Sequence, residues 1–203
     1  MLKGTAKVST DIRRDQIAQA ALRIIAGKGV RGLTVSAIAE EVGISEANIY
    51  RHFSSKDEIL SFTVEKVGRG LKRNIENVLK MGSAASPLVK LKRAFMLHLD
   101  YIEKNEGVPR LVFSDEMHLG NEELKKKLLQ SIASYSATLE SFVKAGQKAG
   151  IIEADINPKA TAVLFIGMVQ AATLRWSLNN FSFSLVTEGT KLWENFEKCI
   201  RTH

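Results

Sequence analysis

The chain has 203 residues, of which 45% are hydrophobic and 25% charged, and its formal net charge is +7. This is an ordinary globular balance in a chain long enough to bury a core. The single cysteine, Cys199, excludes an intramolecular disulfide and a cysteine zinc site, which fits the reducing cytoplasm where we expect the protein to act.

The positive charge is concentrated in the first part of the chain. Residues 1–80 hold 14 Lys and Arg against 9 Asp and Glu, whereas residues 81–203 hold 15 against 13. The excess begins in a polar leader that has no apolar signal core and whose cations are Lys3, Lys7, Arg13 and Arg14. Such a leader is either a solvated tail or an arm that contacts phosphates or a minor groove.

A first helix is predicted near the start of the chain, because apolar residues recur there three and four positions apart. Its apolar face consists of Ile17, Ala21, Ile24 and Ile25. We expect Thr10 or Asp11 to be its N-cap and Gly29 to end it.

The same helical period continues through most of residues 56–201. It predicts a long helix at 56–81, a helix through 91–102 that ends near Gly107-Val108-Pro109, a short segment at 110–118, and helices at 121–150, 158–178 and 185–201. Asn121 and Asn157 are the expected N-caps of two of these helices. Because no stretch alternates apolar and polar residues, the predicted fold is all-α, with about nine helices.

The most apolar run, Ala162 to Val169, is too short to span a bilayer, and Gln170 and Arg175 follow it closely. We interpret this run as part of a buried helix, and we expect no membrane partner.

Residues 33–56, LTVSAIAEEVGISEANIYRHFSSK, carry the clearest functional pattern. Thr34 can cap a short helix in which Ile38 and Val42 face inward, while the small Ala39 lets a second helix cross closely. Gly43 then lies where a turn needs a positive φ angle, which glycine adopts without steric cost.

A second helix follows this turn, with Ser45 as its cap and with Ile49 and Phe53 pointing back to the core. This is the spacing of a helix-turn-helix, whose second helix enters the major groove of DNA. In the alternative interpretation Gly43 merely ends an ordinary helical hairpin, because Ala-x3-Gly alone is a weak pattern. DNA binding is favoured by the complete set Ala39, Gly43, Ile44, Ile49, Tyr50, Phe53 and Lys56.

The segment from about residue 10 to 62 resembles the TetR family of transcriptional regulators. The matching motifs are Leu33-Thr34-Val35, Ile38-Ala39-Glu40-Glu41-Val42-Gly43-Ile44-Ser45, Ile49-Tyr50-Arg51-His52-Phe53 and Lys56-Asp57-Glu58-Ile59-Leu60. The resemblance implies an N-terminal three-helix helix-turn-helix DNA-binding domain at residues 1–55. It also implies a C-terminal helical ligand-binding and dimerisation domain at residues 56–203.

The resemblance also implies which residues touch DNA. They are Thr34, Ser36, Ser45, Glu46, Ala47, Asn48, Tyr50, Arg51, His52 and Lys56. Of these, Thr34, Ser36, Tyr50, His52 and Lys56 would lie on the DNA backbone, whereas base contacts would come from residues such as Glu46, Ala47 and Asn48. Glu46 either accepts from a cytosine amine or merely caps the helix, and we favour the cap.

A ligand pocket is implied among the middle helices. Its expected apolar residues are Phe95, Met96, Leu99, Phe113, Met117, Tyr135, Leu139, Phe142, Phe165 and Met168, each of which is alternatively plain core. Its polar candidates are His98, Arg110, His118 and Arg175, and a cation among them would orient an acidic effector. We expect the unknown small-molecule effector to be apolar or amphipathic.

The last two helices would pair with those of a second copy to form a homodimer. The expected interface residues are Gly167, Ala171, Trp176, Trp193 and Phe196, and the alternative is an intrachain core. A dimer would read two half-sites of a near-palindromic operator roughly 34–36 Å apart.

We therefore expect a ligand-responsive transcriptional regulator, a repressor released from its DNA operator by the effector. The alternative is a constitutive DNA-binding or architectural protein. Asp115, Glu116 and His118 form the one cluster that suggests acid-base chemistry or a metal, but no third ligand is placed by spacing. Since no P-loop, dinucleotide or nucleophile-elbow motif is present, we predict no enzyme, no cofactor and no metal.

Overall fold

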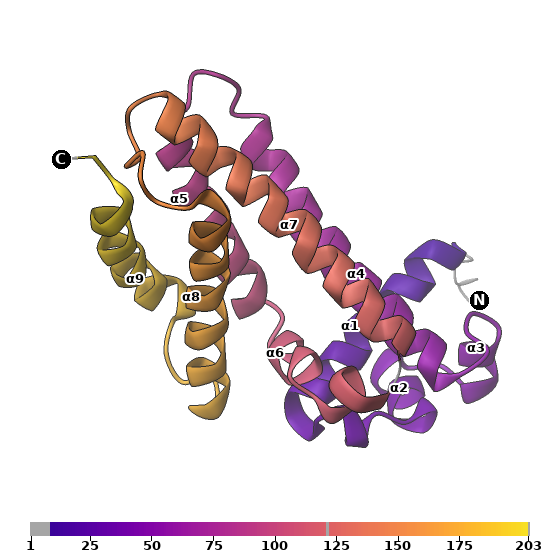
Figure 1. The fold of residues 1–203 in the computed structure, drawn as a ribbon. Helices are drawn as coiled ribbons and strands as arrows, with labels where there is room; N and C mark the ends of the chain where they lie inside the picture. Colours follow the sequence, from indigo (N-terminus) through magenta and orange to yellow (C-terminus); the bar gives the residue numbers. More distant parts are fainter. Residues whose placement is uncertain (1–8, 121, 203) are drawn as a thin grey trace, which may run out of the picture.

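The computed structural model describes residues 9–120 and 122–202, which form helices joined by short turns (Figure 1). The described helices are α1 (Thr10–Lys28), α2 (Val35–Val42), α3 (Glu46–Tyr50), α4 (Lys56–Leu79), α5 (Pro87–Glu103), α6 (Gly107–Val112), α7 (Glu122–Lys148), α8 (Pro158–Leu178) and α9 (Leu185–Ile200), with the single turns η1 (Val30–Gly32) and η2 (Glu116–Gly120). The prediction of an all-α fold with about nine helices is confirmed. The expected cap Asn121 and the leader cations Lys3 and Lys7 lie outside the described residues.

Side-chain caps set the ends of several helices. The N-cap of α1 is Ser9, whose hydroxyl accepts from the Ile12 amide at 3.4 Å, so the predicted caps Thr10 and Asp11 lie inside the helix. Asn157 caps α8 as predicted, accepting from the Ala160 amide at 3.0 Å. The end of α1 at Gly29, with φ of +68°, is also confirmed.

One predicted helix end is wrong. Gly107 begins α6 instead of ending α5, which stops at Glu103. Pro109 is tolerated there because it is the third residue of α6, where a backbone N–H has no acceptor within the helix.

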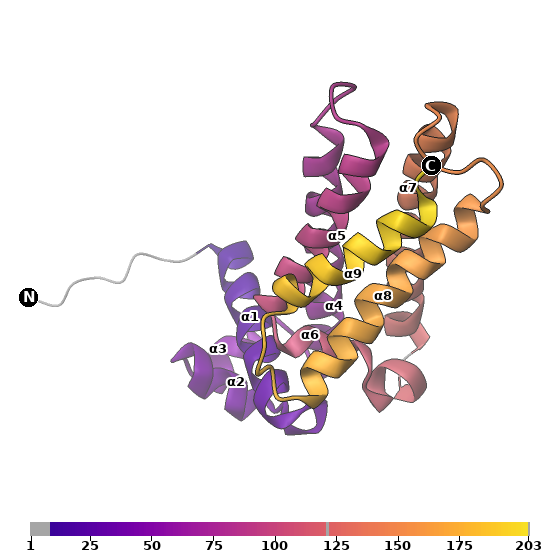
Figure 2. The same cartoon turned by 90° about the vertical axis from the view of Figure 1, so that its left-hand side faces the viewer.

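The helices are arranged around one long axis. In Figure 1, α1, α2 and α3 gather at one end, and α4 leaves them to run beside α7 toward the other end. Figure 2 shows α8 and α9 side by side on another face, where α8 packs on α7 and α9 packs on α5. Helix α4 is therefore continuous from the end where it packs on α1 to the part where it packs on α5 and α7.

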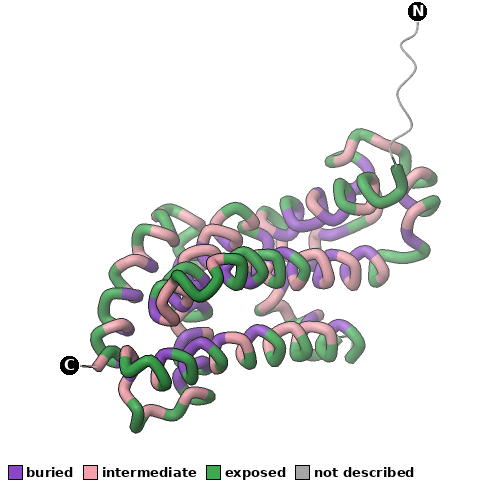
Figure 3. The backbone as a smooth tube through the Cα atoms, turned by 90° about the horizontal axis from the view of Figure 1, so that it is seen from above, coloured by how far each residue is buried: buried purple, intermediate pink, exposed green. Residues whose placement is uncertain are grey.

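The core runs along this axis, and the tube in Figure 3 shows buried positions turned toward the neighbouring helices and exposed positions turned outward. Its largest fully buried side chains include Trp176, Trp193, Phe95 and Phe165. Phe95 contacts Phe165 edge to face with ring centroids 5.3 Å apart, and it contacts Trp193 at 5.9 Å in a tilted arrangement.

Helix α8 differs from the buried helix that its sequence predicts. It is the one described helix whose length and apolar composition would suffice to cross a membrane, and 39% of that apolar window is buried in the fold. One face of α8 packs into the core, while Val163, Leu164, Leu174 and Leu178 on the other face are between 45% and 75% exposed.

Candidate functional site

The turn between α2 and α3 has the geometry that its sequence predicts. Gly43 has φ of +74° and ψ of +39°, a left-handed conformation that would strain a residue with a Cβ. The Ile44 amide donates to the Ala39 carbonyl at 3.0 Å, which closes the end of α2. This turn fixes the angle between the two short helices.

The inner face of the helix pair is buried, as the sequence predicts. Ile38 and Ile49 are fully buried, and Ala39 and Phe53 are exposed by 4% or less. These side chains belong to the core in which α2 packs on α1 and α3 packs on α2. The opposite face of α3 is therefore presented outward from a fixed base.

The residues predicted to touch DNA lie on this outer face or at its margin. Thr34, Ser36, Ser45, Glu46, Ala47, Tyr50, Arg51 and Lys56 are exposed, and Asn48 and His52 are partly buried. Ser45 caps α3 by accepting from the Asn48 amide at 3.3 Å, so the cap that we favoured for Glu46 is made by Ser45. Thr34 caps α2 in the same way, accepting from the Ala37 amide at 3.1 Å.

A network that the sequence did not predict braces the end of α3 against α1 and α4. Arg14 donates to the His52 carbonyl at 2.8 Å and to Glu58 Oε1 at 2.9 Å, and its guanidinium carbon lies 4.2 Å from the centre of the Phe53 ring. Glu58 in turn accepts from the Ser54 amide at 2.7 Å, which with the Ser54 hydroxyl and Arg14 lowers the pKa of its carboxyl. Arg14 is thus a structural brace, whereas the sequence suggested a leader cation.

His52 has an unusual environment within this network. Its Nδ1 is buried without a hydrogen-bond partner. Desolvation, followed by the charges of Arg13, Arg51 and Arg14, lowers the pKa of its imidazole. The ring is consequently neutral at pH 7 in the absence of an added anion.

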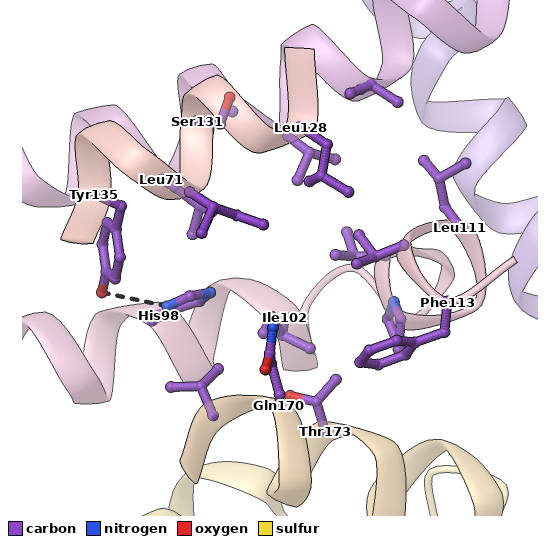
Figure 4. Close-up of a pocket in the computed structure, with 18 of the residues that line it drawn as sticks. Leu71, His98, Ile102, Leu111, Phe113, Leu128, Ser131, Tyr135, Gln170 and Thr173 are labelled. Carbon is purple, nitrogen blue, oxygen red and sulfur yellow. Dashed lines mark hydrogen bonds between the residues drawn. The ribbon is translucent and has the colours of Figure 1, made fainter. Parts of the chain in front are cut away.

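A second feature is a cavity of about 110 Å³ that lies between α4, α5, α6, α7 and α8 (Figure 4). Its lining residues are mostly apolar: Val64, Val67, Gly68, Leu71, His98, Ile102, Val108, Pro109, Leu111, Val112, Phe113, Met117, Leu128, Ser131, Ile132, Tyr135, Ile166, Val169, Gln170 and Thr173. A mostly apolar cavity with a few polar groups is typical of a small-molecule site.

Three of the ten predicted pocket residues, Phe113, Met117 and Tyr135, line this cavity. The others do not line it: Phe95, Leu99, Leu139, Phe142 and Phe165 are buried in the core, and Met96 and Met168 are partly buried against it. The lining residues of α4 are not among the predicted ones, because their spacing of three and four positions is also that of any core-facing helix.

The polar side of the cavity is uncharged. His98 lies beside Tyr135, with 3.2 Å between Nδ1 and the phenolic oxygen, and burial lowers the pKa of His98 to about 4. Burial likewise raises the pKa of Tyr135. Neither side chain is charged at pH 7.

The expectation of a cation in the pocket is wrong for the other three candidates as well. Arg110 donates to the Ala26 carbonyl of α1, Arg175 donates to Glu188 at 3.0 Å, and His118 is exposed on η2. None of them lines the cavity.

Helix α6 connects the cavity with α1. Four of its residues, from Val108 to Val112, line the cavity. On its other side Gly107 lies so close to the backbone of Leu22 that a Cβ would not fit, and Arg110 binds the Ala26 carbonyl. The wall of the cavity therefore abuts the helix that supports α2 and α3.

The structure separates the predicted dimer residues into two groups. Trp176, Trp193 and Phe196 are 8% exposed or less within one chain, and the Trp193 indole donates to Glu197 at 2.7 Å, so these side chains are core and cannot fill a seam between chains. Gly167 and Ala171 are exposed. They belong to an exposed apolar stripe on α8 that consists of Ala160, Val163, Leu164, Gly167, Ala171, Leu174 and Leu178, which we name the α8 stripe.

The acidic cluster does not form a site. Asp115 lies 3.7 Å from Arg31 in an exposed ion pair. Within residues 9–120 and 122–202, no group of three or more His, Cys, Asp or Glu side chains is arranged to hold a metal.

Two family models match the chain. Residues 17–61 match bacterial regulatory proteins of the tetR family, and residues 64–196 match the C-terminal region of YsiA-like proteins. The matched segments correspond to the helix-turn-helix with its flanking helices and to the helices that enclose the cavity.

Several characterised proteins are similar over almost the full chain. The fatty acid metabolism regulator protein of Bacillus subtilis is 25% identical over 180 residues, 88% of this chain and 91% of the relative. The nucleoid occlusion factor SlmA of Vibrio vulnificus is 23% identical over 182 residues, 89% of this chain and 92% of the relative. The crystal structure of the regulator FadR from Bacillus subtilis in complex with stearoyl-CoA has the same fold, with a TM-score of 0.74, 24% identity, and coverage of 90% of this chain and 96% of that one.

Proposed function

The chain belongs to the TetR family of bacterial regulatory proteins, and from this premise we propose that it is a repressor released from its operator by a small apolar or amphipathic effector. The coarser description, a ligand-responsive DNA-binding transcription regulator that is not an enzyme, follows from the family itself. The finer proposal rests chiefly on one observation: α4, which follows α3 and packs on α1, also lines an apolar cavity, and α6, another wall of that cavity, packs on α1.

We propose that α3 enters the major groove, with base contacts from Glu46, Ala47 and Asn48. The exposed Tyr50 and Lys56, at the end of α3 and the start of α4, would bind backbone phosphates. The buried Ile38, Ile49 and Phe53 support this proposal, because a recognition helix needs a rigid base. We place the boundary of the DNA-binding domain after residue 55, immediately before α4.

The proposed release mechanism runs through α4 and α6. Val64, which lines the cavity, lies eight residues after Lys56, or about 12 Å along the helix axis. A ligand in the cavity would contact this helix and α6, which abuts α1. If it binds more tightly to a conformation in which the two reading heads of a dimer no longer match the half-sites, it shifts the population away from the operator-bound form.

Regulators of this family act as dimers on operator DNA. We propose that the α8 stripe is the homodimer interface of this chain. Burying an exposed apolar face is favourable, and the α8 stripe is such a face along most of a helix. A two-fold dimer would match a near-palindromic operator with half-sites roughly 34–36 Å apart.

The similar structure with bound stearoyl-CoA and the similar fatty acid metabolism regulator support an effector with an apolar body. The mostly apolar lining of the cavity supports the same class. We propose cytoplasmic action on this basis, since both DNA and such metabolites are met there.

A second candidate function is constitutive binding at the nucleoid. It is supported by the similarity to the nucleoid occlusion factor SlmA, which is nearly as high as that to the metabolic regulator. The cavity favours the ligand-responsive role, because a protein that only binds DNA and assembles has no need of an apolar cavity that reaches its surface.

The test is binding of the purified protein to the DNA upstream of its own gene, measured by fluorescence anisotropy over a salt series. We expect tight, sequence-selective binding that weakens steeply with salt. Tyr50→Ala should abolish selective binding, and Lys56→Ala should lower the salt slope by about one unit, as expected for one lost phosphate contact.

The matched control is Leu129→Ala, which truncates an exposed side chain on α7. It should bind like the unmodified protein. Equal, weak binding of the unmodified protein to its upstream DNA and to every site recovered in a genomic DNA selection would refute the proposal. Selective binding that no lipophilic compound releases would instead support the constitutive role.

A further inference from the structure

The cavity is built to exclude charge. None of the described residues that line it is Asp, Glu, Lys or Arg. His98 is its one basic group, and it stays neutral at pH 7 because it is buried. An ionised ligand group inside would therefore lose its hydration without gaining a counter-ion, which is costly.

One polar group in the wall has no partner. Thr173 on α8 is 3% exposed, and its hydroxyl oxygen is buried without a hydrogen bond. Four other helical threonines, Thr63, Thr138, Thr161 and Thr190, donate to the carbonyl four residues earlier. Thr173 leaves the bond that its helix offers unmade, although an unmade bond of a buried hydroxyl costs stability.

Thr173 lines the cavity, and its hydroxyl oxygen, which has almost no accessible surface, reaches a ligand when the side chain rotates about χ1. Gln170 lies one turn earlier on the same face of α8, and Phe113 lies opposite (Figure 4). Gln170 and Phe113 are exposed, whereas Thr173 is buried, so the cavity reaches the surface here with Thr173 just inside its mouth. A ligand group that passes the mouth lies beside the Thr173 side chain.

We propose that the effector inserts an uncharged, apolar segment whose hydroxyl or carbonyl group pairs with the Thr173 hydroxyl at the mouth of the cavity. Thr173 then favours ligands that carry such a polar group over purely apolar ones, while the lack of a counter-ion in the cavity excludes ions of the same shape. The inference rests on the proposed function only in taking this cavity as the effector site, and it names the chemistry of the part that enters.

The test uses three probes of equal chain length, 1-hexanol, hexanoate and hexylamine, titrated into the dimeric protein by calorimetry at pH 7 without DNA. Part of a six-carbon chain is small enough to enter the cavity of about 110 Å³ through its mouth. We expect 1-hexanol to bind roughly tenfold or more tightly than either ion.

Thr173→Val removes the hydroxyl at constant shape and should weaken 1-hexanol binding about three- to tenfold, the worth of one neutral hydrogen bond. Thr173→Ser should retain the affinity. Thr161→Val is the matched control, because Thr161 is also a buried threonine of α8 but donates to the Asn157 carbonyl at 2.9 Å, and it should leave 1-hexanol binding unchanged.

Three outcomes overturn the inference: no binding of 1-hexanol, an ion that binds as tightly as the alcohol, or unchanged affinity in Thr173→Val. None of them bears on operator binding, which is measured separately on DNA. A failure of the anisotropy test, in contrast, would refute the regulator without touching the ligand preference of the cavity.

Discussion

Gly107→Ala tests the contact by which α6 meets α1. A Cβ at this position would lie 2.8 Å from the carbonyl carbon of Leu22 and 3.0 Å from its Cα, and closer still to its oxygen. Non-bonded carbon atoms pack best at about 3.5–4.0 Å, so the two helices would have to separate by roughly 1 Å. Because the obstacle is backbone, no side-chain rotation can relieve it.

The expected cost follows from this geometry. Overpacking a well-filled core typically costs about 1–3 kcal/mol, and a clash with backbone belongs at the upper end of that range. We therefore expect the free energy of unfolding to fall by about 3 kcal/mol. For a domain of this size that lowers Tm by roughly 6–12 °C.

The measurement is urea and thermal unfolding followed by far-ultraviolet circular dichroism. The control is Gly27→Ala on α1, where nothing lies within 4 Å of the added methyl group. This control should gain about 0.5–1 kcal/mol, because alanine is the better helix former. If Gly107→Ala is as stable as the unmodified protein, α6 and α1 are not in the close contact described above.

Three further predictions concern the interface, the DNA-reading face and the core. Leu174→Asp places a charge in the α8 stripe and should convert the dimer to a monomer, as measured by light scattering. Leu119→Asp, at an exposed leucine outside the stripe, should remain dimeric. Equal behaviour of the two variants would contradict the proposed interface. The pKa of His52 lies below its usual value in the free protein and a nearby phosphate would raise it, so operator affinity should increase as pH falls from 8 to 6, and this increase should vanish in His52→Gln. Thr161→Val should lower the free energy of unfolding by about 1 kcal/mol, because it removes a hydrogen bond. Thr173→Val removes an unpaired buried hydroxyl and should leave the free energy of unfolding unchanged or raise it. A larger decrease in Thr173→Val than in Thr161→Val would mean that the Thr173 hydroxyl is hydrogen-bonded in solution.

The helix-turn-helix could be predicted from the sequence because its determinants are local. Gly43 needs its left-handed φ for a turn of three residues, and Ile38 and Ile49 are buried by the period of two short helices. Every one of these features is fixed by residues within one segment of about twenty positions. Once the buried residues of the helix pair are assigned, the remaining residues of the second helix must form its exposed face.

The cavity could not be predicted in the same way, because it is made by five helices that meet only in the folded chain. The predicted wall favoured large apolar residues such as Phe95 and Phe165, and these pack against one another in the core instead. A cavity forms where side chains are small or short, as at Gly68 and Ser131. Hydrophobic periodicity does not distinguish a filled interior from one that leaves space.

Hydrophobic periodicity is equally insufficient to predict which face of α8 is exposed. Its sequence is apolar on all sides, so periodicity could not separate the face that carries Trp176 from the face that carries Leu174. Only the packing of α8 on α7 and α9 assigns the first to the core and leaves the second exposed. The bulky aromatic residues, which the sequence suggested for the seam between chains, are used within the chain.

The contact between Gly107 and Leu22 also bears on how the cavity can act on DNA. A contact with spare volume absorbs a displacement, whereas a contact without room for a single methyl group transmits it. Leu71, the cavity residue of α4 farthest from the DNA-reading end, lies fifteen residues after Lys56, about 22 Å along the helix. In the proposed mechanism, a ligand that moves α4 and α6 by a fraction of an ångström at the cavity would act on the DNA-binding end through the length of α4 and through the close contact of α6 with α1. The two-fold axis of the proposed dimer would double any change in the separation of the two α3 helices, so a small displacement would suffice to disturb the match to two half-sites without unfolding of either domain.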